Sequence, residues 1–370
     1  MICPIHLDCP GCQLWSSPYD QQIILKKNKL AQLMQLKVDD IQFIYAGEHS
    51  LRTRFDFIVK KNEFGLVNKN KQLIPIVRCL QLNSQLQDAF DLLKRVNFNV
   101  EIGTLRLRSS EYEKKYGLWL DFSNIDIKNL LLEKKTLNHL NQYFFIEIGQ
   151  RKKTISFEEI DSQYKLMDPE PKLWFSTLEN TKQNELKPTP LYCAVSNFTQ
   201  PSPLTANLIV ETILRWIKNI KAQHVWEFGS GVGQYTVPLL STDVNLTAFE
   251  FDSFATQCLK QSIKDKPYFD KIQIQTGNFQ IEKNITFIEN LKPPQVCLVN
   301  PPKSGLKDFK NILYNLKPEF LIYVSCYPET MMQDLKTINC NQDYKIKETV
   351  IVDQFPQTDH FEVVCLLQRV

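Results

Sequence analysis

Glycine is scarce in this chain: it accounts for 11 of 370 residues, whereas average usage is about 7%. The sequence has no internal repeat and no low-complexity tract, and 43% hydrophobic with 23% charged residues is typical of a globular protein. At this length we expect two or three domains rather than one core. Against that background three glycines fall within five positions, Gly229, Gly231 and Gly233, and this concentration needs an explanation.

Long hydrophobic runs are also missing. No stretch approaches the roughly 18 apolar residues of a membrane span, so we expect no membrane partner. The start, "MICPIHLDCPGCQ", lacks the charged and apolar segments of a secretory signal, and we expect a cytoplasmic protein and a monomer. A net charge of only +3 permits a nucleic-acid partner without requiring one. The partner therefore has to be inferred from local sites.

Cysteine, by contrast, occurs ten times, and a reducing compartment argues against a disulfide framework. The first 190 residues hold four cysteines: Cys3, Cys9, Cys12 and Cys79. Three of them form a C-x5-C-x2-C cluster, and Cys79 alone remains in this half to complete the four soft ligands of an inorganic centre. An iron-sulfur cluster is the favoured interpretation. Zinc, whose structural sites tend to pair two C-x2-C knuckles, and plain packing are the alternatives.

The clustered glycines follow a short apolar strand, "HVWEF" (224–228), and precede a stretch that can open a helix. A strand, turn and helix of this kind bring backbone close to a ligand. Glu250 ends the next expected strand, where a carboxylate would accept hydrogen bonds from ribose hydroxyls. The spacing is G-x-G-x-G rather than the G-x-G-x-x-G of pyrophosphate sites, so S-adenosylmethionine fits better than a dinucleotide. An ordinary glycine turn is the alternative.

Strands alternate with helical stretches through the C-terminal half. Further strands are expected over 271–278, 295–302 and 320–326 and in the final "HFEVVCLLQR". This alternation predicts a mostly parallel α/β sheet, whose ligands bind at the carboxyl ends of the strands. Asn300 and Cys326 stand at two such ends, so both are expected at the ligand crevice.

Asn300 begins an N-P-P motif that also occurs in methyltransferases acting on exocyclic amines. In those enzymes an aromatic residue follows the prolines and stacks on the target ring. Here Lys303 follows, which disfavours amine methylation.

Cys326 suggests another methyl acceptor. A thiolate that adds to carbon 6 of uracil makes carbon 5 nucleophilic enough to attack a methyl sulfonium. A base must then remove the carbon 5 proton, and "FPQTDHFEVV" offers Asp359, His360 and Glu362. The alternative interpretation is a core cysteine and a solvated carboxylate.

The central region alternates arginines with apolar residues. The arginines are Arg52 and Arg54 in one segment and Arg106 and Arg108 in another. This pattern indicates strands with a basic face, either solvated or in contact with phosphate. Segments rich in proline and polar residues indicate a boundary near residue 190. We expect an iron-sulfur region with the start of the central domain over 1–80, a β-rich central domain over 81–190 and a methyltransferase domain over 191–370.

Several motifs together resemble a known family. "VNPPKSGL", "LIYVSCYPETMMQDL" and "VDQFPQTDHFEVV", in this order after "SGVG", are similar to the RNA uracil-C5 methyltransferases, which make 5-methyluridine in ribosomal and transfer RNA. "CPIHLDCPGCQ" with Cys79 resembles the iron-sulfur site of the family's 23S ribosomal RNA branch. With its first cysteine at position 3, the chain resembles the shorter bacterial 23S enzyme, which lacks an N-terminal RNA-binding barrel. The likeness spans nearly the whole chain and is strongest from Asn197 onward.

The resemblance implies an α/β fold: a C-terminal Rossmann-like class I S-adenosylmethionine methyltransferase sheet with an N-terminal iron-sulfur motif and a β-rich central domain. It implies an RNA substrate, 23S rRNA first, with Cys326 as nucleophile and Glu362 as base. The implied donor contacts are Gln200, Gly229, Glu250 and Asn300. The implied ligands of a [4Fe-4S] cluster are Cys3, Cys9, Cys12 and Cys79.

The chain departs from the family pattern at two of these motifs. Lys303 stands where the family has arginine, and Gly229 stands where it has an aromatic residue that contacts the donor. Donor contacts at this turn are therefore expected from the backbone. One alternative is an iron-sulfur RNA-binding or redox protein whose methyltransferase fold has lost activity, and another is a tRNA uracil-C5 methyltransferase. Cys326 and Glu362 favour an enzyme, because a binding module does not need them.

Overall fold

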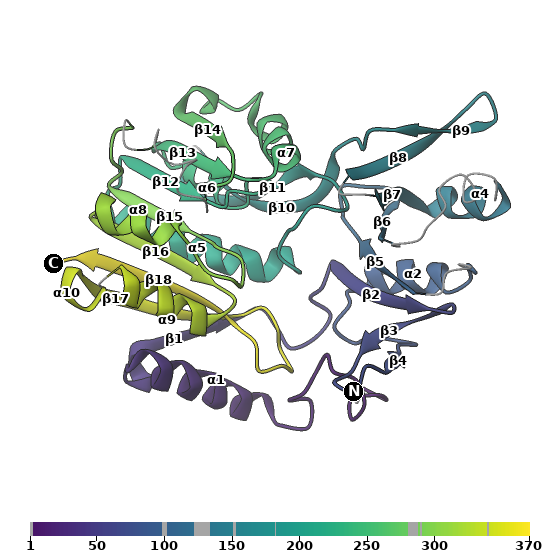
Figure 1. Cartoon of the computed structure of the whole chain (residues 1–370), viewed down its shortest axis with the longest axis horizontal. Helices are drawn as coiled ribbons and strands as arrows, with labels where there is room; N and C mark the ends of the chain where they lie inside the picture. The colour runs from purple at the N-terminus through teal and green to yellow at the C-terminus, as the bar shows by residue number, and fades with distance from the viewer. Residues whose placement is uncertain are drawn as a thin grey trace. The chain divides into compact units, whose positions relative to one another are not determined.

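The computed structural model describes residues 3–97, 102–121, 134–150, 153–181, 183–279, 288, 291–338 and 340–370 (Figure 1). The chain divides into two compact units. Unit 1 comprises Met1–Ser16, Gly47–Phe175 and Tyr192–Pro203, and unit 2 comprises Ser17–Ala46, Ser176–Leu191 and Leu204–Val370. Residues 17–46 therefore group with the C-terminal unit, whereas the boundaries expected from the sequence assign them to the first 80 residues.

Unit 2 is built on an eight-stranded sheet of order β1-β17-β18-β16-β15-β12-β13-β14. Its strands are β1 (Ile41–Tyr45), β12 (His224–Phe228), β13 (Asn245–Glu250), β14 (Ile272–Thr276), β15 (Val296–Val299), β16 (Phe320–Ser325), β17 (Tyr344–Asp353) and β18 (Glu362–Arg369). β18 runs antiparallel to β16 and β17, and the other neighbouring pairs are parallel. The predicted, mostly parallel α/β sheet is thus confirmed.

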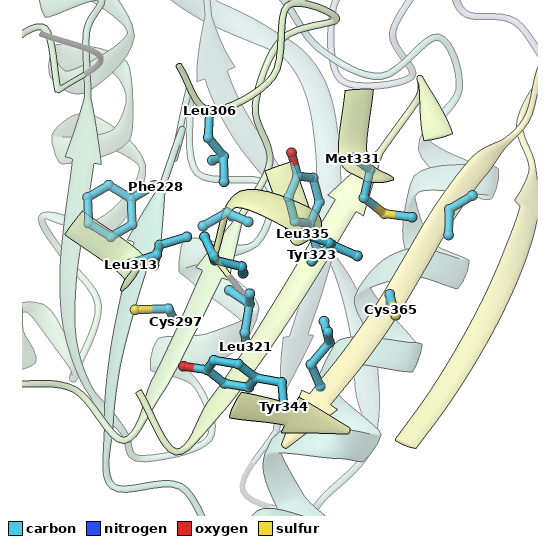
Figure 2. Packing of buried hydrophobic residues seen from close by; sticks show 14 of the residues in the cluster. Phe228, Cys297, Leu306, Leu313, Leu321, Tyr323, Met331, Leu335, Tyr344 and Cys365 are labelled. Atoms are coloured by element: carbon cyan, nitrogen blue, oxygen red, sulfur yellow. The ribbon is translucent and has the colours of Figure 1, made fainter. Parts of the chain in front are cut away.

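One face of this sheet packs against three helices, α1 (Tyr19–Met34), α8 (Phe309–Leu316) and α9 (Pro328–Thr337). Alternate strand residues such as Leu321 and Tyr323 meet Met331 and Leu335 of α9 in this core (Figure 2). Strands covered on both faces read as continuous apolar runs, which explains "FLIYVS" in β16. The remaining described helices of this half are α5 (Pro203–Ile220), α6 (Thr236–Leu240), α7 (Ser253–Ile263), α10 (Cys340–Asp343) and the short 3-10 turns Val38–Asp40 and Phe269–Lys271.

Unit 1 contains a second eight-stranded sheet, of order β4-β3-β2-β5-β6-β7-β8-β9. Its strands are β2 (Arg54–Lys60), β3 (Glu63–Val67), β4 (Leu73–Pro75), β5 (Gly103–Arg108), β6 (Tyr116–Asp121), β7 (Phe144–Gln150), β8 (Lys153–Ile160) and β9 (Gln163–Met167). Among the strand pairs described in this sheet, β6 and β7 are the parallel one, and the others are antiparallel. Helices α2 (Ser84–Leu93) and α4 (Lys134–Tyr143) share its core.

A separate two-stranded sheet pairs β10 (Lys172–Asn180) with β11 (Leu186–Cys193). The central part of the chain is therefore rich in strands, as its alternating pattern predicts. None of the helices in the described ranges combines the length and the apolar character that crossing a membrane requires.

Candidate active site

Strand pairing brings Cys326 and Glu362 together. β16 ends at Ser325, one residue before Cys326, and β18 begins at Glu362. In their antiparallel register Ser325 pairs with Val363, so the next opposed positions are Cys326 and Glu362. Directly opposed residues of such a pair have Cβ atoms about 4.5–5.5 Å apart. Cys326 and Glu362, from two separate motifs, therefore occupy neighbouring positions at the carboxyl end of β16, where the charge of Glu362 acts on the Cys326 thiol.

Cys326 is half-buried, and the charges of Glu362 and Lys303 act on its pKa in opposite directions. Burial, followed by the Glu362 carboxylate, raises the pKa of Cys326 to about 11, while the ammonium group of Lys303 acts in the opposite direction. Because the thiolate is the reactive form, Cys326 in the free protein must lose its proton as it attacks. The backbone N–H of Tyr327 donates to Ser325 Oγ at 3.0 Å, which holds the turn that carries the thiol.

Glu362 is buried, with 2% of its surface exposed. Burial raises the pKa of Glu362 to about 8, and a hydrogen bond from Gln354 opposes that rise. Gln354 Nε2 donates to Glu362 Oε2 at 3.2 Å, and its own Oε1 accepts from Thr205 Oγ1 of α5 at 3.2 Å. A carboxyl group with a pKa near the working pH is suited to general base catalysis.

The two other candidate bases differ from Glu362 in their surroundings. The side chains of Asp359 and His360 are 49% and 52% exposed, and they pair with each other at 3.8 Å. Water solvates their charged forms, so neither is held in a dry environment as Glu362 is.

The glycine turn follows β12 as the sequence predicts. Gly229, Gly231 and Gly233 all adopt positive φ angles, of 81°, 54° and 103°, a region that other residues rarely enter. A Cβ atom at Gly229 would lie 2.9 Å from the carbonyl oxygen of Asn300, so the turn also needs glycine for close approach. The N–H of Asn300 donates to the carbonyl of Phe228 at 3.1 Å, which joins the ends of β12 and β15.

Glu250 at the end of β13 supports this turn. Its Oε2 accepts from the backbone N–H of Gly231 at 2.7 Å and its Oε1 accepts from that of Asp252 at 2.8 Å. Each carboxylate oxygen can accept a second hydrogen bond, so Glu250 remains able to bind ribose hydroxyls. Gly229, Glu250 and Asn300 belong to unit 2 together with Cys326 and Glu362, whereas Gln200 is a buried residue of unit 1.

Glu227, a residue of β12 that the sequence reasoning missed, is buried behind the turn. Burial raises the pKa of Glu227 to about 8; a hydrogen bond from Thr236 lowers it, and the charge of Glu250 raises it. Thr236 Oγ1 donates to Glu227 Oε2 at 2.6 Å, but Oε1 has no hydrogen-bond partner within the described part of the chain. The signal was present in "HVWEF": a carboxylate in an apolar strand next to a ligand turn needs a polar partner.

The four N-terminal cysteines lie in unit 1 and influence one another electrostatically. Burial raises the pKa of Cys12 to about 12; the charges of Cys79, Cys9 and Cys3 raise it as well, and Arg52 opposes them. Four soft thiols with a nearby cation suit an iron-sulfur cluster in their chemistry. However, in the described ranges no group of three or more His, Cys, Asp or Glu side chains has the placement that holds a metal ion, so the predicted cluster is not supported.

Two of the central arginines, Arg106 and Arg108, make contacts within the protein instead of forming a solvated face. Arg106 donates to Asp56 Oδ1 at 2.6 Å and to the carbonyl of Ser196 at 2.6 Å. Arg108 is buried and donates to the carbonyls of Val195, at 2.8 Å, and Asn197. These two arginines therefore hold a backbone segment of unit 1, because its carbonyls need donors once they are buried.

Comparisons with known proteins agree on the methylation of RNA. A family model described as tRNA (Uracil-5-)-methyltransferase matches residues 191–370. An RNA methyltransferase of Bdellovibrio bacteriovorus is 38% identical over 99% of this chain and 95% of its own length. A 23S rRNA (uracil(747)-C(5))-methyltransferase of Serratia proteamaculans is 25% identical and covers 98% of this chain and 97% of its own.

A similar fold is known from a solved structure. The tRNA (uracil-54, C5)-methyltransferase of Pyrococcus abyssi, in complex with S-adenosyl-L-homocysteine, superposes with a TM-score of 0.68 and 19% identity. The match covers 97% of this chain and 86% of that one.

Proposed function

The chain belongs to the family of S-adenosylmethionine-dependent RNA uracil-5-methyltransferases, and we propose that it methylates carbon 5 of a uridine in 23S ribosomal RNA as a cytoplasmic monomer. The observation that carries the chemistry is the opposition of Cys326 and Glu362 across β16 and β18. The ribosomal substrate is supported by relatives named as 23S rRNA enzymes that match nearly the whole chain. A tRNA substrate is the second candidate, because the family model and the similar structure bear that description.

The proposed reaction has three steps in which the residues of this chain act. Cys326 sulfur bonds to carbon 6 of the uracil, and the electron pair displaced onto the ring makes carbon 5 nucleophilic. S-adenosylmethionine would supply the electrophilic methyl sulfonium for carbon 5, the sulfur–methyl bond breaking so that its electron pair leaves with S-adenosylhomocysteine. Glu362 then takes the carbon 5 proton, the C–H electron pair forms the carbon 5–carbon 6 double bond, and the bond to Cys326 breaks to release its thiolate.

The methyl donor would bind at the carboxyl ends of β12, β13 and β15. Glu250 would accept from ribose hydroxyls, and the backbone near Gly229 and Asn300 would contact the methionine part. Glu227 Oε1, which has no hydrogen-bond partner among the described residues, would accept a hydrogen bond from an N–H group of S-adenosylmethionine. A buried polar atom would then have the partner that it needs.

The N-terminal cysteines would hold a [4Fe-4S] cluster. The support is the chemistry of the donor set, four cysteines of one unit, because thiolates are the ligands of such clusters; their side chains would have to come closer together than the described structure places them. The role of the cluster would be structural, because Cys326 and Glu362 belong to the other unit.

The test of the proposed substrate compares two RNAs with one labelled methyl donor. We expect label in unmodified 23S rRNA and little label in unmodified tRNA, and Cys326→Ala should remove it. Label in tRNA alone would favour the second candidate. No label in either RNA, together with no heat on titration with S-adenosylhomocysteine, would indicate a protein that has lost the activity.

A further inference from the structure

A buried ion pair joins α1 to the end of β17. Lys26 Nζ lies 2.8 Å from Asp353 Oδ1, and both side chains are completely buried. Tyr19, also on α1, donates from its hydroxyl group to Asp353 Oδ2 at 2.8 Å. Burial lowers the pKa of Lys26, and the charge of Asp353 and the hydrogen bond to it oppose that change. Asp353 is therefore held from two sides by one helix.

The same helix also binds the segment that leads from β17 to Glu362. Lys26 donates to the carbonyl of Phe355 at 3.2 Å, and the N–H of Phe355 donates to Asp353 Oδ1 at 3.1 Å. Gln22 and Gln357 form a reciprocal pair: Gln22 Nε2 donates to Gln357 Oε1 at 2.8 Å, and the N–H of Gln357 donates to Gln22 Oε1 at 3.1 Å. Directional polar contacts, rather than apolar packing alone, thus set the path of this loop.

Burying the Lys26–Asp353 ion pair costs free energy. Desolvating two charges costs several kcal/mol per ion, and apolar replacements of buried ion pairs are often neutral or stabilising. The Lys26–Asp353 pair is therefore weak evidence for a stabilising role. Its distinguishing property is geometric, because charge-assisted hydrogen bonds fix one position where apolar side chains would tolerate several.

The position fixed by the pair is adjacent to the proposed base. Asp353 precedes Gln354, whose side chain donates to Glu362 at 3.2 Å. Val352, on the other side of Asp353, pairs with Glu362 across β17 and β18. Because Lys26 neutralises Asp353, the pair acts on Glu362 through geometry rather than through net charge.

We propose that Asp353, fixed by Lys26 and Tyr19 of α1, is a positioning residue for proton removal by Glu362. This inference rests on the proposed function. When the pair is lost, Gln354 and Glu362 move out of line with the carbon 5 proton. Transfer of that proton to Glu362, formation of the carbon 5–carbon 6 double bond and release of the Cys326 thiolate all slow down. Addition of Cys326 and methyl transfer precede this step and keep their rates.

The experiment uses the double variant Lys26→Met and Asp353→Asn in the full chain, which leaves no single charge buried. The matched control is Arg215→Met with Glu348→Gln, an exposed pair at 2.8 Å that also ends on β17. Single turnovers with substrate RNA and labelled donor should show product release slowed by about 10- to 100-fold, as expected for a misplaced catalytic group. A denaturation-resistant adduct of protein and methylated RNA should accumulate, with affinity for S-adenosylhomocysteine unchanged, and the control should behave as wild type.

If the pair has only a structural role, the double variant should lose thermal stability, and the rates of all reaction steps should fall together without accumulation of the adduct. That result, or wild-type release by the folded double variant, would overturn the proposal. If the double variant does not fold, Tyr19→Phe decides: it removes one donor to Asp353, and it must give a smaller amount of the same adduct. Glu362→Gln distinguishes failure of the proposed function from failure of the role proposed for Asp353. Absence of the adduct in Glu362→Gln would refute the assignment of Glu362 as the base, independently of the result for Asp353.

Discussion

At the scale of single residues, Glu362 and Cys326 must both be deprotonated to act. The thiol must lose a proton to attack, and the carboxyl group must already be ionised to accept one. Burial raises the pKa of both groups, to about 11 for Cys326 and to about 8 for Glu362, and each ionised group would disfavour the other. Burial therefore opposes the active form of each group, so the proton of the Cys326 thiol and any proton on Glu362 must pass to solvent before each group acts.

The change Glu362→Gln should trap the enzyme rather than merely slow it. Addition and methyl transfer precede proton removal, and an amide cannot take the proton. Incubation with RNA and labelled donor should give a denaturation-resistant band that contains protein, RNA and label. The band should be absent when the same chain also carries Cys326→Ala. Normal turnover by Glu362→Gln would transfer the role of base to His360 or Asp359.

The pH dependence of product release should follow the carboxyl group. Because only ionised Glu362 accepts the proton, release should be slow at low pH, rise through about pH 8 and level off above it. Gln354→Leu removes the hydrogen bond that lowers this pKa, so the midpoint should shift to higher pH. Gln333→Leu, a change at an exposed position of α9, should leave it unchanged. An unchanged or lower midpoint for Gln354→Leu would contradict the assignment.

At the scale of elements, α9 holds the loop that carries Asn300 and Lys303. Asp334 is buried, and its Oδ2 accepts from the N–H of Leu306 at 2.8 Å and from the Tyr323 hydroxyl at 2.7 Å. A Cβ atom at Gly305, whose φ is 75°, would lie 2.6 Å from the same oxygen. The loop after β15 is therefore shaped by one carboxylate that strand and helix packing place beneath it.

Asp334→Asn should disturb this loop, because the amide brings N–H groups to a site that already contains two donors. An unsatisfied buried donor costs about 1–3 kcal/mol, so we expect chemical denaturation to show a loss of that size. Affinity for the methyl-donor site, measured by calorimetry with S-adenosylhomocysteine, should fall as well. Asp308→Asn, at an exposed position in the same region, serves as the control. Equal stability of the two variants would show that the contacts of Asp334 contribute little.

At the scale of the whole molecule, the cysteines of the proposed cluster belong to unit 1, and the proposed catalytic residues belong to unit 2. Anaerobically purified protein should be brown, with about four irons per chain as a four-cysteine cluster requires. Cys79→Ser should bleach the protein and lower its thermal stability, whereas Cys258→Ala in α7 should keep the iron. A colourless preparation that contains zinc would rule the cluster out.

The sequence by itself determined the features that depend on neighbouring residues. The α/β class follows from apolar strands alternating with helices, and the family follows from ordered motifs; the structure and the comparisons confirm both. The glycine turn could also be predicted, because positive φ angles select glycine within a few positions. The predicted iron-sulfur site rests on spacing alone, and spacing does not fix where side chains point.

Tertiary structure alone decided how distant segments meet. The register of β16 and β18 opposes Cys326 and Glu362, and burial separates Glu362 from its exposed neighbours Asp359 and His360. Nothing in "ILKKNK" distinguishes Lys26 from Lys27, yet only Lys26 is fully buried, against Asp353. The physical reason is that desolvation and ion pairing depend on what surrounds a side chain in space, and those surroundings are contributed by residues far away along the chain.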